Sequence, residues 1–302
     1  PAADEHRPKM ANKRPAPTLA RDLLTIAKPG ITFMNVLMVA GGMALADTWP
    51  QVSVWLFALV GTTAIVIAAN ALNMYIERES DLLMARTRNR PLPARRMNPL
   101  VVLAGGIVLG VAATVMLALG VNAVTAGLGV LGFVLYVWVY TPLKRRTPLA
   151  LAIGAVPGAV PPLMGWTAAT GRIEIPGIVL FLILFLWQLP HFLAISIYRR
   201  VDYERAGIRV VPAVRGEDVA KMQALIYSTL LVPISLTLVP LGVANYLYFI
   251  VAGGLGAWFF ILSMRGLEPG AGNRWARRFF LASLVYLPAL TLALVLDVIL
   301  AT

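Results

Sequence analysis

The character of this chain is clearest in residues 52–81, which read VSVWLFALVGTTAIVIAANALNMYIERESD. The stretch is largely apolar up to residue 76 and long enough to cross a bilayer as a helix, which takes about 20 such residues. Its last part turns polar and acidic. These residues therefore predict a membrane-spanning helix that ends in a group of polar side chains.

The whole chain shares this apolar character. Of its 302 residues, 59% are hydrophobic and 13% are charged, whereas a soluble domain is roughly half apolar and about a quarter charged. The composition excludes a simple soluble globule and an intrinsically disordered chain. The sequence contains no cysteine, which excludes disulfides, thiolate metal sites and cysteine nucleophiles.

Nine apolar runs predict membrane spans, at residues 31–47, 52–76, 100–118, 120–140, 149–168, 175–197, 222–242, 244–264 and 279–300. None of them shows the two-residue alternation of an outer-membrane strand. We therefore expect an all-α fold, a polytopic bundle of nine transmembrane helices with a central cavity open to the cytoplasmic side. Residues 1–24 are expected to form a mobile basic tail, and residues 25–302 a single transmembrane domain.

The basic residues predict the orientation of the bundle. Segment 1–30 and the loops near 77–99, 141–148, 198–221 and 265–278 contain every Lys and Arg except Arg172. Basic loops stay on the cytoplasmic side of a membrane, so we expect the amino terminus inside and the carboxyl terminus outside the cell's inner membrane. The basic loops on the cytoplasmic side then account for most of the net charge of +12, and we expect no nucleic-acid partner.

The first polar motif lies at the end of the second span. Asn73, Glu77 and Asp81 follow i, i+4, i+8 spacing, which places them on one helix face together with Asn70. Two carboxylates at this spacing repel each other unless a cation lies between them. Mg²⁺ prefers oxygen ligands and shares such carboxylates with substrate phosphates. The motif therefore favours a magnesium site.

A group of arginines follows directly in a loop stiffened by proline. Arg86, Arg88 and Arg90 precede Pro91 and Pro93, and guanidinium groups match the geometry of phosphate oxygens. Acids that bind a metal, followed by arginines, indicate a diphosphate site. The alternative is a solvated helix end whose acids pair with Arg78 and Arg86.

A second motif lies where the fourth span ends. Tyr140 and Lys144 are four residues apart, and Arg145 follows. These residues either belong to the same site or form an interfacial tyrosine with cations that extend toward the membrane surface.

A third motif surrounds a histidine within the sixth span. Trp187, Gln188 and His191 lie in an otherwise apolar run, and Asp202 and Tyr203 follow in the next loop. A histidine in such a run is either a hydrogen-bonded core residue or a functional group. Asp202 and Glu204 are two residues apart and would not share a helix face, and of the two Asp202 is the better candidate for a second acidic site.

Taken together, the motifs resemble the protohaem IX farnesyltransferase (haem O synthase) family, a branch of the UbiA-type intramembrane prenyltransferase superfamily. The resemblance covers about residues 25–215, in family order. Its strings are Asn70-x-x-Asn73-x-x-x-Glu77-x-x-x-Asp81, Met84-Ala-Arg86-Thr-Arg88-Asn-Arg90-Pro91, Tyr140-Thr-Pro-Leu-Lys144-Arg145, Ile153-Gly-Ala-Val-Pro-Gly-Ala-Val-Pro161-Pro162, Trp187-Gln188-Leu-Pro190-His191-Phe192 and Asp202-Tyr203-x-x-Ala206-Gly207. The family usually has Asp where this chain has Glu77, a change that keeps the charge.

The resemblance implies a reaction. Farnesyl diphosphate, haem B and water would give haem O and diphosphate at a membrane-embedded site. It also implies Mg²⁺ as cofactor, and the residues that would bind the ion are Asn73, Glu77, Asp81 and Asp202. A haem A synthase is an implied partner that accepts the product.

The same resemblance implies roles for the remaining motif residues. The arginines of segment 86–90, with Lys144 and Arg145, would receive the negative charge of diphosphate. Aromatic rings such as those of Tyr140 and Trp187 would stabilise an allylic cation. His191 would ligate the haem iron, bond to the haem or assist the water step. The remaining substrate-binding candidates are Asn70, Gln188 and Tyr203.

Three other functions compete with this interpretation. The first is another UbiA-type prenyltransferase, acting on a quinone precursor or chlorophyllide, from which the Trp-Gln-Leu-Pro-His-Phe string distinguishes the haem branch. The second is a secondary transporter, although the polar groups lie at helix ends rather than at the bilayer midplane. The third is a structural membrane subunit, which would leave the Asn–acid motif unexplained.

Overall fold

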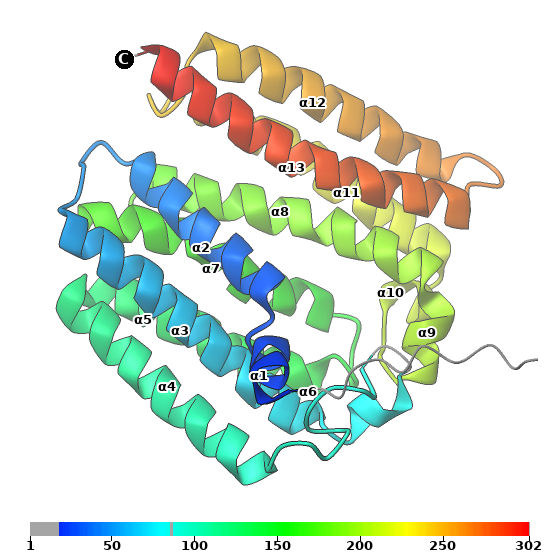
Figure 1. The fold of residues 1–302 in the computed structure, drawn as a ribbon. Helices are drawn as coiled ribbons and strands as arrows, with labels where there is room; N and C mark the ends of the chain where they lie inside the picture. The colour runs from blue at the N-terminus through cyan, green and yellow to red at the C-terminus, as the bar shows by residue number, and fades with distance from the viewer. Residues whose placement is uncertain (1–17, 85–86, 302) are drawn as a thin grey trace, which may run out of the picture.

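The computed structural model describes residues 18–84 and 87–301, and within these ranges every regular element is a helix (Figure 1). The elements are α1 (Leu19–Ala27), α2 (Pro29–Ala44), α3 (Val52–Glu77), the 3-10 turn η1 (Ser80–Leu83), α4 (Pro99–Gly120), α5 (Ala123–Val134), the π-helix η2 (Leu135–Tyr140), α6 (Thr141–Leu143), α7 (Ala150–Thr170), α8 (Ile175–Tyr198), α9 (Arg200–Arg205), α10 (Val211–Val214), α11 (Glu217–Leu236), α12 (Tyr246–Met264), the 3-10 turn η3 (Arg265–Leu267) and α13 (Asn273–Ala301). The predicted all-α fold is confirmed.

Eight helices of the described part are long and apolar enough to cross a membrane: α3, α4, the continuous run from α5 to α6, α7, α8, α11, α12 with η3, and α13. The pair α1 and α2 adds a ninth only when the two are counted as one span, and that span is bent by 45°. The chain is therefore a multi-pass membrane protein. The exact count of nine, the central cavity and the side to which it opens stay predictions.

The bend between α1 and α2 has a local cause. Lys28 has a left-handed backbone (φ +47°), and Pro29 follows it as the first residue of α2. A residue before proline is disfavoured in the right-handed helical region, so α1 ends there. Residues 19–24, which we expected in the basic tail, form most of α1, and α1 packs on α3. Thr18 caps the start of α1, and residues 1–17 of that tail lie outside the described residues.

Helix α7 lies inside the bundle, packed against α2, α5 and α8. Its contact with α2 brings the two backbones together. A Cβ on Gly165 would overlap the carbonyl oxygen of Val39, and one on Gly42 would overlap that of Pro162. Only glycine, which has no side chain, allows this approach. The two glycines thus determine how closely α2 and α7 pack.

The connections 78–84 and 87–98, 144–149, 199–216 and 265–272, with α9 and α10, lie at one end of the bundle, along the right and lower side of Figure 1. We call this the basic end, because nearly all of the loop arginines and lysines lie there. The backbone N–H of Arg209 donates to the carbonyl oxygen of Lys144 at 3.0 Å. This bond ties the loop after α9 to the end of α6.

Replacement of Gly165 by alanine tests the α2–α7 contact. The new methyl group would press on the Val39 carbonyl, and overpacking of this kind costs roughly 1–3 kcal/mol. We expect Gly165→Ala to lower the melting temperature of the detergent-solubilised protein by several degrees. The matched control is Gly254→Ala in α12, where a Cβ meets no neighbour within 4 Å. Equal melting temperatures for the two variants would contradict the packing described.

Candidate functional site

The acid face lies at the end of α3. We use this name for Asn73 and Glu77, on the last turns of α3, and Asp81, in η1. Their exposed fractions are 2%, 7% and 1%. Helix α3 ends at Glu77, so Asp81 reaches the group through a 3-10 turn and not through the continuous helix that the spacing predicted. Buried carboxylates need partners, because burial of an uncompensated charge is costly.

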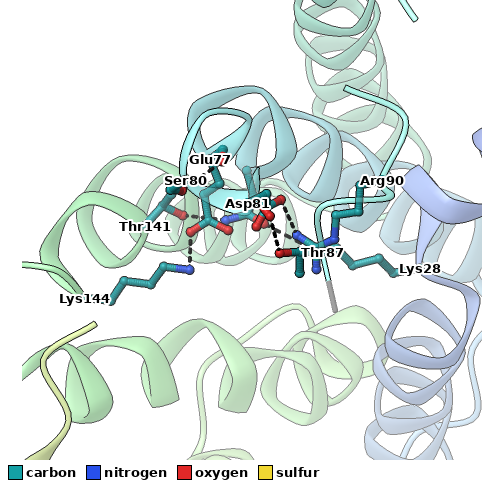
Figure 2. A network of polar contacts seen from close by, with 9 residues as sticks. Lys28, Glu77, Ser80, Asp81, Thr87, Arg90, Thr141 and Lys144 are labelled. Atoms are coloured by element: carbon teal, nitrogen blue, oxygen red, sulfur yellow. Dashed lines mark hydrogen bonds and ion pairs between the residues drawn. The ribbon is translucent and has the colours of Figure 1, made fainter. Parts of the chain in front are cut away.

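Each member of the acid face meets a cation from a different segment (Figure 2). The Lys144 ammonium, at the end of α6, contacts the Glu77 carboxylate. From the loop before α4, the Arg90 guanidinium donates to Asp81 Oδ2 at 2.7 Å. At the α1–α2 bend, Lys28 Nζ donates to Asn73 Oδ1 at 3.1 Å. Three segments far apart in sequence are thus joined at one buried group of oxygens.

The alternative pairing that the sequence left open differs from this arrangement. Arg78 lies 3.6 Å from the exposed Glu79 and donates to the carbonyl oxygen of Tyr75. It forms no ion pair with Glu77 or Asp81. Arg86, the other expected partner, lies outside the described residues.

One carboxylate oxygen of the acid face has no partner. Asp81 Oδ1 is buried and makes no hydrogen bond within the described part of the chain. An unsatisfied buried oxygen costs about 1–3 kcal/mol, and a bound cation is one partner that would satisfy it. The oxygens of Asn73, Glu77 and Asp81 are hard donors of the type that Mg²⁺ takes. The residues present therefore fit a magnesium ion.

The second motif is held directly against the acid face. Asn73 Nδ2 donates to Thr141 Oγ1 at 3.0 Å, and the Thr141 hydroxyl donates to the carbonyl oxygen of Tyr136 at 2.7 Å. Residues Leu135–Tyr140 form a π-helix, a rare conformation that often occurs at functional sites. The Lys144 ammonium lies 5.9 Å from the centre of the Tyr140 ring. Sequence reasoning missed Thr141, although it stands inside the Tyr-Thr-Pro-Leu-Lys string.

The third motif lies where α8 packs on α13. His191 Nδ1 lies 2.7 Å from Ser283 Oγ, and Trp187 Nε1 donates to the Ser283 carbonyl at 2.8 Å. Gln188 instead faces α7, where its side-chain oxygen fills the space that a side chain on Gly158 would need. Ser283 was not predicted as a site residue. Its only signal in the sequence is that it is a polar residue in an apolar run.

Asp202 and Tyr203 lie in the short helix α9 at the basic end. The Asp202 side chain is 64% exposed and lies 3.5 Å from Arg199. In the described part of the chain, no three acidic or histidine side chains gather closely enough to hold a metal ion. The structure thus brings Asn73, Glu77 and Asp81 together without Asp202. The role of Asp202 as a fourth ligand stays a prediction.

The other predicted residues surround this centre. Asn70 Nδ2 donates to the carbonyl oxygen of Ala27 at 3.4 Å and so links α3 to the end of α1. Arg88 and Arg145 are exposed at the basic end. Their roles in substrate binding, like those of the whole predicted site, stay predictions.

An ion pair that the sequence analysis missed positions the arginine loop. Arg96 donates to both carboxylate oxygens of Asp22 in α1, at 2.7–3.1 Å, and also to the carbonyl oxygen of Asn89 at 3.0 Å. Asp22 is buried, and its hydrogen bond to Arg96 raises the pKa of that guanidinium above its usual value. The pair fastens α1 to the loop that carries Arg90.

Comparisons with known proteins show the family to which this chain belongs. Residues 35–284 match the UbiA prenyltransferase family, and the chain belongs to that family. A relative from Sorangium cellulosum (strain So ce56), named protoheme IX farnesyltransferase, is 54% identical over 79% of this chain and 85% of its own length. One of the same name from Anaeromyxobacter sp. (strain Fw109-5) is 50% identical over 92% of this chain and 93% of its own length.

Solved structures share the fold at low sequence identity. A digeranylgeranylglyceryl phosphate synthase structure superposes with a TM-score of 0.82 at 15% identity, over 92% of this chain and 98% of the other. A UbiA homologue from Archaeoglobus fulgidus, bound to DMAPP and Mg²⁺, gives a TM-score of 0.65 at 14% identity, over 90% of this chain and 99% of the other. These likenesses concern the fold alone.

A double-mutant cycle tests whether the Asp22–Arg96 pair holds the arginine loop. Charge-assisted, bidentate bonds are stronger than neutral ones, so we expect Asp22→Asn and Arg96→Gln each to speed amide hydrogen exchange in residues 87–96. The double variant should add little to either change. Arg95→Gln is the control, because Arg95 is exposed and its neighbour Arg96 carries the contact. Purely additive effects in the double variant would contradict the coupling.

Proposed function

We propose that this chain transfers the farnesyl group of farnesyl diphosphate to a vinyl group of haem B, with addition of water, to give haem O and diphosphate. The relatives at 50% and 54% identity carry the name of this activity over most of the chain. The observation that carries the proposal is the buried acid face, whose oxygens are matched by cations from three segments and include one without a partner.

The proposed metal is Mg²⁺, bound by Asn73, Glu77 and Asp81, with Asp202 as a further ligand. When bound, the ion would act as a Lewis acid toward the diphosphate oxygens. A UbiA homologue has been solved with Mg²⁺ and DMAPP, which supports this assignment.

The cations around the acid face are proposed to bind the leaving group. Arg90 and Lys144 pair with the two carboxylates of the acid face, and Lys28 donates to the amide oxygen of Asn73. When the C1–O bond of farnesyl diphosphate breaks, its electron pair leaves with the diphosphate, and these same groups would receive that charge. Preorganised cations of this kind stabilise a transition state without reorganisation.

The hydrocarbon part of the reaction needs protection from water. The terminal carbon of the vinyl group forms the new bond to farnesyl C1, and water adds to the neighbouring carbon and loses a proton. The Tyr140 ring, packed beside Lys144, and the Trp187 ring are proposed to stabilise the allylic cation through their faces. The apolar helices around them would keep the cation from early hydrolysis.

The proposal also covers the acceptor, the membrane in which the protein lies and the enzyme that uses the product. Family membership makes a transporter or a structural subunit poor competitors, and the remaining rival acceptors are a quinone precursor and chlorophyllide. We place the protein in the inner membrane, with the amino terminus and the basic end on the cytoplasmic side, as its basic loops predict. A haem A synthase is the proposed consumer of haem O.

Replacement of Asp81 tests the acid face. Asp81→Asn removes the carboxylate charge that balances Arg90 and that would bind the metal. We therefore expect the formation of haem O from farnesyl diphosphate and haem B to fall at least a hundredfold. Chromatography and mass spectrometry measure the product. Glu79→Gln is the matched control two residues earlier, because the Glu79 side chain is 86% exposed, and it should keep wild-type activity. Undiminished product from Asp81→Asn would contradict the proposal.

Removal of divalent metal tests the cofactor. We expect membranes treated with EDTA to form no haem O, and added Mg²⁺ to restore the activity, because diphosphate leaves poorly without neutralisation of its charge. The mass gain on the porphyrin, measured with and without Mg²⁺, identifies the acceptor in the same assay. Full activity in EDTA would exclude the magnesium assignment.

A further inference from the structure

The α8–α13 contact contains a hydrogen-bond chain that runs from His191 through Ser283 to the carbonyl oxygen of Phe280. The Ser283 hydroxyl donates to the carbonyl oxygen of Phe280 at 2.6 Å. A serine hydroxyl has one proton and two acceptor lone pairs. With that proton directed at the Phe280 carbonyl, the remaining contact, at 2.7 Å between Ser283 Oγ and His191 Nδ1, is made by an Nδ1–H donor. In this tautomer Nε2 of the neutral ring carries the lone pair.

The same serine also holds the ring beside His191. Trp187 Nε1 donates to the Ser283 carbonyl at 2.8 Å, and the Trp187 and His191 rings stack at 5.0 Å between their centres. The Phe280 ring lies 4.8 Å from the imidazole on α13. The imidazole is thus held by one hydrogen bond and by aromatic rings from two helices. Its position depends on α13, a helix outside the predicted motifs.

The lone pair of Nε2 is available to a ligand. His191 is partly exposed, and within the described part of the chain Nε2 makes no hydrogen bond. No described carboxylate contacts the ring, so an imidazolium formed by uptake of a proton from water would have no counter-charge. A bond to iron needs only the neutral lone pair, and a neutral imidazole is a common haem ligand.

We propose that His191 Nε2 is an axial ligand to the iron of the acceptor haem, and that Ser283 is the positioning residue that fixes the tautomer and the ring orientation. The inference rests on the proposed function, because it takes haem as the substrate. It selects one of the three roles that the sequence left open for His191. In metal sites generally, the partner that bonds the second nitrogen orients the ligating ring, and its loss lowers metal affinity by about 10–100-fold.

The test measures ferric haem B binding to the purified full-length protein in detergent, without farnesyl diphosphate, by visible absorption and electron paramagnetic resonance. The wild type should show histidine ligation. His191→Ala should lose that signature, and added imidazole should restore it. Ser283→Ala should bind haem about 10–100-fold more weakly with an altered ligand signal, whereas Ser283→Thr, which keeps a hydroxyl, should resemble the wild type.

The matched control is Ser263→Ala in α12. Ser263 is equally buried in a helix, and its hydroxyl donates to the Phe260 carbonyl at 2.7 Å, but no histidine contacts it. This variant should leave the haem spectrum and affinity unchanged. Elution of each variant as a single species in size-exclusion chromatography shows that it is folded.

Two outcomes would overturn the inference. An unchanged haem spectrum in His191→Ala excludes iron ligation, and an unchanged spectrum and affinity in Ser283→Ala excludes the positioning role. Failure of the proposed function looks different. In that case the wild type would bind haem through His191 but form no haem O when farnesyl diphosphate and Mg²⁺ are added.

Discussion

The burial of two carboxylates at the end of a membrane-spanning helix is the constraint on which the rest of this structure depends. Glu77 and Asp81 are nearly inaccessible to solvent, and charges in such surroundings must be neutralised. The neutralising groups are Arg90, from the loop before α4, and Lys144, at the end of α6, while Lys28 from the α1–α2 bend donates to the Asn73 amide beside them. The acid face thus determines where three separate segments meet, and it brings together the cations that we propose bind diphosphate.

Around the acid face, individual hydrogen bonds and ion pairs fix the positions of the loops at the basic end. The Asp22–Arg96 pair fastens the arginine loop to α1, and the bond from Arg209 to the Lys144 carbonyl fastens the loop after α9 to α6. The motif of Trp187 and His191, which we propose faces haem, is held by a different helix, α13, through Ser283. The diphosphate and acceptor parts of the proposed site are therefore positioned by different contacts.

Much of the fold followed from the sequence, because membrane spans depend on local apolar length and the positions of basic loops. The i, i+4 spacing placed Asn73 and Glu77 correctly on one face of α3. The end of α3 at Glu77 was not predictable from spacing, since it depends on a 3-10 turn stabilised by contacts with the following loop. Partners such as Lys28 and Ser283 were missed because they come from distant segments and have no local signature.

The central claim is that the acid face binds a divalent ion together with diphosphate. The most direct measurement is binding of inorganic diphosphate to the purified protein, followed by electron paramagnetic resonance of Mn²⁺ used in place of Mg²⁺. We expect diphosphate and Mn²⁺ each to strengthen the binding of the other in the wild type, and this coupling to disappear in Asp81→Asn. Diphosphate binding of equal strength with and without the metal would contradict it.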